Sequence, residues 1–344
     1  MSSPRVGISG ARRLALVAFG IAVGIVGAEI GLHLAQPSLG FHFPTARLTD
    51  EQFTRRADQV SDGNGVRYTF DAAGFRTSAA PTPPTGTPAI LFIGDSFTQG
   101  FGVGADETFA AVTCAQLLQR GIPARCLNAG VSGFGTAHEL RLLQRLLQRD
   151  DLGIAAVVFQ LCPYNDLRDN WEDGGFGIEG DRLAVWDPPH VPIEIRLRDG
   201  LLDNALARHS SLVILLANAW VAAVPIDEKS DASMFALERR LVGEVVQTTQ
   251  ARRIPIVLLV AAPAWEVEQT SSQPYDEPGR ANFMAAVAQE AGVPWLDSRA
   301  LARAPEHYLP NDGHFSPAGN ALIGAALAEQ LTPLLKPAPA QPAP

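Results

Sequence analysis

The sequence predicts an α/β protein with a parallel sheet of about five strands and helices packed on both faces. Two observations indicate this class. Short, continuously apolar runs recur after residue 88, and such runs are typical of strands buried on both faces. Segments with helical spacing of apolar residues separate the runs, and this alternation requires crossover connections between parallel strands. A chain of 344 residues is long enough to bury such a core.

The predicted elements alternate along residues 89–335, which we assign to one domain. The first strand, Ala89–Gly94, is apolar throughout, and the Ile254–Ala261 strand is the most apolar of all. Residues 166–232 are Pro-rich and too long for a simple crossover, so we expect an insertion that caps one end of the sheet, with a helix over Ser211–Val221. The other expected strands are Ala124–Asn128, Ala155–Leu161 and Val293–Asp297, and the expected helices are Asp106–Arg120, Ala137–Arg149, Phe235–Arg252, Arg280–Ala291 and Pro317–Leu331.

Residues 1–36 predict a signal anchor, that is, an N-terminal transmembrane helix. Three arginines precede Leu14–Ala28, which has no charged residue, and the apolar segment continues to Ala35, interrupted by Glu29 and His33. Its length lies between the ~20 residues of a spanning helix and the ~7–15 of a signal-peptide core, so a cleaved signal is the alternative. Either reading places the following residues on the extracytoplasmic side, in the periplasm or at the cell surface. Residues 37–88 form a lead-in segment and a Pro-rich linker, and 336–344 a low-complexity tail expected to be disordered.

Charge and cysteine content exclude several classes of function. The formal net charge of −9 argues against nucleic-acid binding, which depends on clustered Lys and Arg. Cys114, Cys126 and Cys162 are too few for a disulfide framework. Cys114 and Cys126 can pair and leave Cys162 free, or all three can be buried and reduced, which we favour. No Cys/His spacing indicates a zinc site. The sequence leaves the oligomeric state open.

Four polar turns follow four of the expected strands. Ser96 lies in a Gly-flanked turn after the first strand, where a nucleophile would be exposed. Residues 128–135 form a turn of small residues, Asn165 follows the third strand, and Asp312 and His314 follow the fifth. Each turn alone also fits a helix cap or a solvated loop. Because ligands bind at the carboxyl ends of parallel strands, the four together predict acyl transfer through a covalent acyl-serine.

These turns resemble the motif blocks of the SGNH (GDSL-type) hydrolases, and the chain is similar to membrane-anchored bacterial members over residues 89–331. The blocks are Gly94-Asp95-Ser96, Asn128–Gly133, Pro163-Tyr164-Asn165-Asp166 and Asp312-Gly313-His314. Two positions depart from the common pattern: Pro163 replaces a glycine, and the last block is D-x-H where many members have D-x-x-H. The segment Tyr68–Arg76 also resembles the lead-in of anchored members.

The resemblance implies the three-layer α/β/α, flavodoxin-like SGNH hydrolase fold and an extracytoplasmic serine esterase that acts on small acyl esters of a carbohydrate or lipid. It implies Ser96 as nucleophile, His314 as base and Asp312 as the acid that orients it. The amides of Ser96 and Gly133 and the side chain of Asn165 would form the oxyanion hole. No cofactor or metal is expected.

Two alternatives to the esterase stay open. One is an O-acyltransferase that uses the same residues on an envelope polysaccharide. The other is a catalytically inactive, membrane-tethered glycan-binding module. Trp171, Trp186 and Trp265 lie in or near loops that would surround the site, and we expect packing rather than ligand stacking from them. Asp166 is expected to buttress its own loop.

Overall fold

The computed structural model divides the chain into two compact units, Met1–Pro44 with Ile193–Pro225, and Thr45–Pro192 with Ile226–Pro344. The described residues are 10–35, 59–60, 66–78, 83–84, 86–173, 176–179, 182–185, 210, 212–213, 215–216, 229–268, 279–310 and 312–335.

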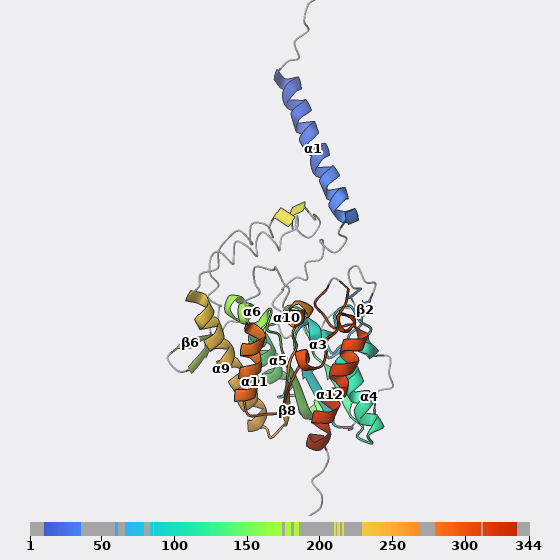
Figure 1. Ribbon diagram of the computed structural model, residues 1–344, viewed down its shortest axis with the longest axis vertical. Helices are drawn as coiled ribbons and strands as arrows, with labels where there is room; N and C mark the ends of the chain where they lie inside the picture. The colour runs from blue at the N-terminus through green and yellow to red at the C-terminus, as the bar shows by residue number, and fades with distance from the viewer. Residues whose placement is uncertain are drawn as a thin grey trace, which may run out of the picture. The chain divides into compact units, whose positions relative to one another are not determined.

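The first unit contains one long helix, α1 (Gly10–Ala35) (Figure 1). The Glu29 carboxylate accepts hydrogen bonds from the Ser210 hydroxyl at 2.8 Å and from the Leu212 amide at 3.0 Å. Of the helix expected over Ser211–Val221, residues 212–213 and 215–216 are helical, and the others lie outside the described residues. Within the described ranges, no helix combines the length and apolarity needed to cross a membrane, so the expected transmembrane helix is not confirmed.

The second unit is built on the predicted parallel sheet of five strands, in the order β4-β3-β5-β8-β9. All four strand pairs are parallel. The first strand of the sheet, β3, lies between its two successors along the chain, β4 and β5. This is the flavodoxin-like order, and the connections after β3 and β4 leave the sheet in opposite directions. The strands are β3 (Ala89–Ile93), β4 (Arg125–Asn128), β5 (Ile154–Leu161), β8 (Ile256–Val260) and β9 (Trp295–Asp297).

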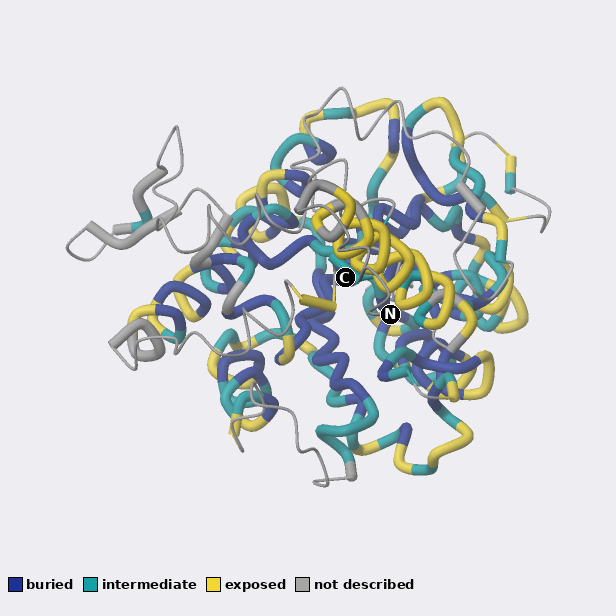
Figure 2. Tube along the Cα trace, turned by 90° about the horizontal axis from the view of Figure 1, so that it is seen from above, coloured by how far each residue is buried: buried dark blue, intermediate teal, exposed yellow. Residues whose placement is uncertain are grey.

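Helices cover both faces of this sheet, which gives the three layers expected (Figure 1). Alternate side chains of β3 serve the two cores: Leu91 and Ile93 face one layer, while Ile90 and Phe92 face the other. Along these helices buried and exposed stretches alternate, as amphipathic packing requires (Figure 2). One layer holds α5 (Thr136–Leu146), α9 (Lys229–Ala251) and α11 (Arg280–Glu290), and the other holds α4 (Phe109–Gln119) and α12 (Pro317–Leu335).

Short elements at the carboxyl ends of the strands connect the sheet to its helices. In Figure 1, α3, α6 and α10 lie together at this end of the sheet. The expected insertion contains an antiparallel hairpin, β6–β7. The short elements are β1 (Gln59–Val60), β2 (Arg67–Tyr68), α3 (Ser96–Gln99), α6 (Asp166–Asp173), β6 (Phe176–Glu179), β7 (Arg182–Val185) and α10 (Ala264–Glu268), with 3-10 turns at Ala105–Glu107, Asp150–Leu152, Ser298–Ala300 and Pro305–His307.

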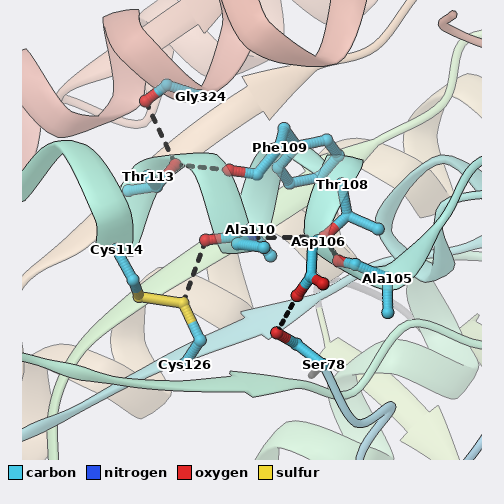
Figure 3. The surroundings of a disulfide bond; sticks show 11 residues. Ser78, Ala105, Asp106, Thr108, Phe109, Ala110, Thr113, Cys114, Cys126 and Gly324 are labelled. Atoms are coloured by element: carbon cyan, nitrogen blue, oxygen red, sulfur yellow. Dashed lines mark hydrogen bonds between the residues drawn. A yellow bond between two sulfur atoms is a disulfide. The ribbon is translucent and has the colours of Figure 1, made fainter. Parts of the chain in front are cut away.

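A disulfide joins α4 to the edge strand β4 (Figure 3). Cys114 and Cys126 are separated by 12 positions in sequence, and their Cα atoms lie 6.2 Å apart. Cys162 is free and buried. The interpretation that we favoured from the sequence, three reduced cysteines, is therefore wrong for the first two. The physical reason is the packing of α4 on the sheet, which brings the two side chains within bonding reach.

Candidate active site

The first polar turn places Ser96 at the start of α3, directly after the buried strand β3. The Asp95 side chain caps this short helix by accepting a hydrogen bond from the Phe97 amide at 2.8 Å. The Asp95 amide donates to the Gln160 side chain at 2.9 Å, and Thr98 donates its hydroxyl to the same oxygen at 2.9 Å. Gly94 leaves no space for a Cβ beside the Gln160 side chain. The turn is thus held rigidly from the neighbouring strand β5.

Ser96, His314 and Asp312 form one hydrogen-bonded chain. The Ser96 Oγ atom lies 2.7 Å from His314 Nε2, and His314 Nδ1 lies 2.6 Å from Asp312 Oδ1. The same carboxylate oxygen accepts a hydrogen bond from the His314 backbone amide at 2.8 Å. Burial alone would raise the pKa of Asp312, but hydrogen bonds and the charge of His314 outweigh it and hold that pKa below its ordinary value. An ionised Asp312 can stabilise a protonated His314, so the chain can accept the proton of Ser96.

Aromatic rings fix the orientation of the His314 ring. The ring centres of Phe97 and Phe101 lie 4.7 Å and 4.6 Å from it. Trp265, which belongs to α10, packs against Gly313 in the turn before His314. This is the packing role expected for Trp265. The side chains of the other two tryptophans considered, Trp171 and Trp186, lie outside the described residues.

The small-residue turn after β4 is bonded to the helix that begins with Ser96. Both the amide and the hydroxyl of Ser132 donate to the Gln99 side-chain oxygen at 2.7 Å. Gly130 lies so close to α3 that a Cβ would sit 2.7 Å from the Gln99 Cα atom. Gly133 has a φ of 79°, a conformation that favours glycine. Among the described residues, no acceptor is bonded to the backbone amides of Ser96 and Gly133.

Asn165 lies beside this turn, as the sequence predicted. Its side-chain nitrogen donates to the Phe134 carbonyl at 3.3 Å and to the Asp169 carboxylate at 3.1 Å. The structure therefore brings four predicted features to the carboxyl end of the sheet: the hydroxyl, the Asp/His pair, the small-residue turn and the amide side chain. Pro163, the departure in this block, is buried, and Asn165 is partly buried.

Buried carboxyl groups lie behind the site. The Asp166 carboxylate accepts a hydrogen bond from the Cys162 amide at 2.6 Å and so buttresses its loop, as expected. Glu238 of α9 accepts hydrogen bonds from Thr136 at 2.9 Å and from Asn170. Thr136 is the first residue of α5, and Asn170 lies within α6. Burial raises the pKa of Glu238 to about 8, and burial followed by the charge of Glu238 raises that of Asp166 well above its ordinary range.

Sequence reasoning missed the residues that hold these turns, namely Gln99, Gln160 and Glu238. Gln160 had a visible signal, since it is a polar residue inside the apolar run Ala155–Leu161. A buried polar residue must find hydrogen-bond partners. Those of Gln160 are the Asp95 amide and the Thr98 hydroxyl, in the turn after β3. Across the described residues, no group of three or more His, Cys, Asp or Glu side chains is arranged to hold a metal ion.

The sequence and fold have relatives among known proteins. Among solved structures, the chain is similar to TesA (16% identity, TM-score 0.42, covering 72% of this chain and 99% of that one). It is also similar to a lipolytic protein of the G-D-S-L family from Desulfitobacterium hafniense DCB-2 (13%, TM-score 0.40, 71% and 99%). A third is Est24, a carbohydrate acetylesterase from Sinorhizobium meliloti (15%, TM-score 0.40, 72% and 99%).

No curated protein matches the sequence. The model of the GDSL-like lipase/acylhydrolase family matches residues 92–322, which include Ser96, Gly133, Asn165, Asp312 and His314. Since this match spans more than half of the chain, the protein belongs to the GDSL-like lipase/acylhydrolase family of SGNH hydrolases, whose members cleave ester bonds.

Proposed function

We propose that this protein is an extracytoplasmic serine esterase that hydrolyses small acyl esters through an acyl intermediate on Ser96. The observation that carries the proposal is the hydrogen-bonded chain Ser96–His314–Asp312, with heavy-atom distances of 2.7 Å and 2.6 Å. These distances are those that a nucleophile and its general base require. A member of this family in which these three residues are hydrogen-bonded in series has every side chain that acyl transfer needs.

The reaction runs in two halves. His314 Nε2 takes the proton of Ser96 as its Oγ atom attacks the ester carbonyl, and Asp312 stabilises the resulting imidazolium. Collapse of the tetrahedral intermediate breaks the bond to the alcohol, which leaves with the proton from His314. Water then attacks the acyl-serine with His314 again as base, and the acid is released. Ser96 is thereby restored.

The oxyanion of each tetrahedral intermediate binds the amides of Ser96 and Gly133 and the side-chain nitrogen of Asn165. That nitrogen carries two hydrogens. Asp169 holds one at 3.1 Å, while the contact with the Phe134 carbonyl is longer, at 3.3 Å. Because the two hydrogens are fixed in the plane of the amide, the whole Asn165 amide group must rotate about its Cβ–Cγ bond to direct one of them at the oxyanion. Removal of one such donor typically lowers turnover by ~10²–10³.

Location and substrate size rest on separate observations. The disulfide between Cys114 and Cys126 supports an oxidising, extracytoplasmic compartment. The two phenyl rings packed on His314 support a small acyl group, because they take up space beside the reacting atoms. The exposed Tyr164 ring, next to Asn165, offers an apolar face to the alcohol part of a carbohydrate or lipid ester.

The test uses the full-length protein with nitrophenyl esters from acetyl to octanoyl. We expect the highest kcat/KM for the shortest chains, and we expect Ser96→Ala to remove both turnover and covalent labelling by a fluorophosphonate probe. Unchanged activity in Ser96→Ala would overturn the site assignment. Absence of labelling in the wild-type protein would indicate an inactive binding module. Turnover that rises with added glycan and yields a glycan ester would indicate an O-acyltransferase.

A further inference from the structure

A buried arginine ahead of the family match contacts the turn that carries Ser96. Residues 66–78 precede the matched range, which begins at residue 92. Arg76 is nevertheless 5% exposed, and its neighbours Phe75 and Tyr68 are 3% and 2% exposed. This lead-in segment is therefore part of the core of its unit, and its side chains have a structural task there.

The Arg76 guanidinium donates to three backbone carbonyls at the end of α3 and in the turn that follows it. Its Nη1 atom donates to the carbonyls of Gln99 and Gly100, the latter at 2.8 Å, and its Nη2 atom donates to the Val103 carbonyl at 2.7 Å. The last carbonyls of a helix have no partner within the helix and carry partial negative charge, so a cation is favourable there. Arg76 thus satisfies the C-terminal end of the helix whose N-terminal end presents Ser96.

Tyr68 and Gly100 lie directly against the Arg76 side chain. The Tyr68 ring lies 4.4 Å from the guanidinium carbon, and the Tyr68 hydroxyl accepts the Gly102 amide at 2.8 Å. A Cβ at Gly100 would lie 2.7 Å from the Arg76 Nη1 atom. Burial lowers the pKa of Arg76 to about 10, so the side chain still carries its charge at neutral pH.

The same contacts reach the oxyanion turn. Arg76 holds the backbone of Gln99, and the Gln99 side chain binds both the amide and the hydroxyl of Ser132 at 2.7 Å. Ser132 precedes Gly133, whose amide is one of the oxyanion donors. The Arg76 amide also donates to the Asn128 carbonyl at 2.9 Å, where this turn begins. One residue therefore bonds to both turns, the one that carries Ser96 and the one that carries Gly133.

We propose that Arg76 is a positioning residue for the esterase reaction, which sets the Gly133 amide relative to the Ser96 nucleophile through Gln99. The proposal rests on the proposed function, since a displaced oxyanion donor has a consequence only if an oxyanion forms. Arg76 itself touches no reacting atom. Loss of the Arg76 side chain should consequently lower kcat and leave substrate binding nearly unchanged, because the hydrogen bonds from the oxyanion-hole donors to the oxyanion develop fully only in the transition state.

The test compares Arg76→Met with a matched control, Arg125→Met. Arg125 also donates to two backbone carbonyls, those of Thr87 at 3.0 Å and Leu152, but at the amino end of β4. We expect Arg76→Met to lower kcat by about 10–100-fold, less than the complete loss of a donor, with KM within about threefold. Arg125→Met should lower the Tm and leave kcat within about twofold. Both are assayed well below the Tm of each variant.

Two further variants keep the proposal testable if Arg76→Met does not fold. Arg76→Lys retains the charge with one donor group and should show a smaller loss of kcat. Gln99→Met leaves every Arg76 bond in place and removes the acceptor for Ser132, so it should lower kcat to a similar degree. The double variant Arg76→Lys/Gln99→Met should be less impaired than the product of the two single losses, because both act on one chain of contacts.

The outcomes separate this inference from the proposed function. If wild-type protein hydrolyses esters and its Ser96 is labelled, but the Arg76 and Gln99 variants keep wild-type kcat while their Tm falls, then Arg76 has a purely structural role and the inference is wrong. If the wild-type protein shows neither hydrolysis nor labelling, the proposed function itself fails. A loss of kcat confined to the Arg76 and Gln99 variants supports the inference.

Discussion

The turn that carries His314 has no room for a side chain at Gly313, and this makes Gly313→Ala a sharp test of the site. A methyl group there would lie 2.5 Å from the Trp265 Cη2 atom and 2.9 Å from the Pro263 Cβ atom. Carbon atoms in contact prefer separations of about 3.5–4.0 Å, so the turn must move by about 1 Å. Overpacking of this kind destabilises proteins by about 1–3 kcal/mol.

Activity should fall further than stability. The adjacent His314 Nε2 lies 2.7 Å from Ser96 Oγ, and a displacement of about 1 Å takes the pair beyond the reach of ~3.2 Å that proton transfer needs. A misplacement of that size in a catalytic group costs about 10²-fold in rate. We therefore expect a kcat about 10²-fold lower for Gly313→Ala, measured below its Tm with nitrophenyl acetate.

Two companion variants control this experiment. Gly243 lies in α9 with open space around it, so Gly243→Ala should leave kcat unchanged and raise stability by up to ~1 kcal/mol. Trp265→Leu removes the ring that the new methyl group meets, and the double variant Gly313→Ala/Trp265→Leu should regain part of the lost kcat. Wild-type activity in Gly313→Ala, or no recovery in the double variant, would refute the reasoning.

Three other predictions concern stability, and each has a thermal or urea unfolding readout. Reduction of the Cys114–Cys126 bond, or its replacement by two serines, should cost about 3 kcal/mol with little effect on kcat, since the bond closes a loop of 12 positions away from the site; an unchanged Tm would contradict this. Glu139 has a buried carboxyl group whose two oxygens find no hydrogen-bond partner in the described structure, so Glu139→Met should raise stability by about 1–3 kcal/mol, and a loss of stability would show that the group is paired. Burial raises the pKa of Glu238 from 4.5 to about 8, so between these pH values the folded protein holds a proton that the unfolded chain releases. The free energy of unfolding should therefore fall as the pH rises from 4.5 to about 8, and Glu238→Gln should make this fall less steep. An equally steep fall in the variant would assign the pH dependence to other carboxyl groups.

Much of the fold was predictable because it follows from local patterns. The apolar runs became β3, β5 and β8, which are buried on both faces, and the helical segments between them became the covering layers. The polar turns were also predictable as a group, because parallel strands bring their carboxyl ends to one edge. That rule alone places Ser96 and His314, 218 positions apart, at the same end of the sheet.

Other features depended on contacts between distant segments. The pairing of Cys114 with Cys126 follows from how α4 packs on β4, and neither the spacing nor the composition favoured it over three reduced cysteines. The lead-in was read as a segment ahead of the domain, yet Arg76 donates to carbonyls at the end of α3 and in the turn that follows it. Residues 66–78 contain two arginines, Arg67 and Arg76, and only the packed structure shows that the second of them is buried.

By itself, the sequence determined the parallel sheet, the two helical layers and the residue types at the active end, because apolar periodicity and strand–helix alternation leave few other arrangements. Only the tertiary structure decided which groups hold that end together: Gln99, Gln160 and Glu238 inside the domain, and Arg76 from the lead-in. The physical reason is that a buried polar group must find its partners wherever the packed chain puts them, and those partners lie at no fixed spacing in the sequence.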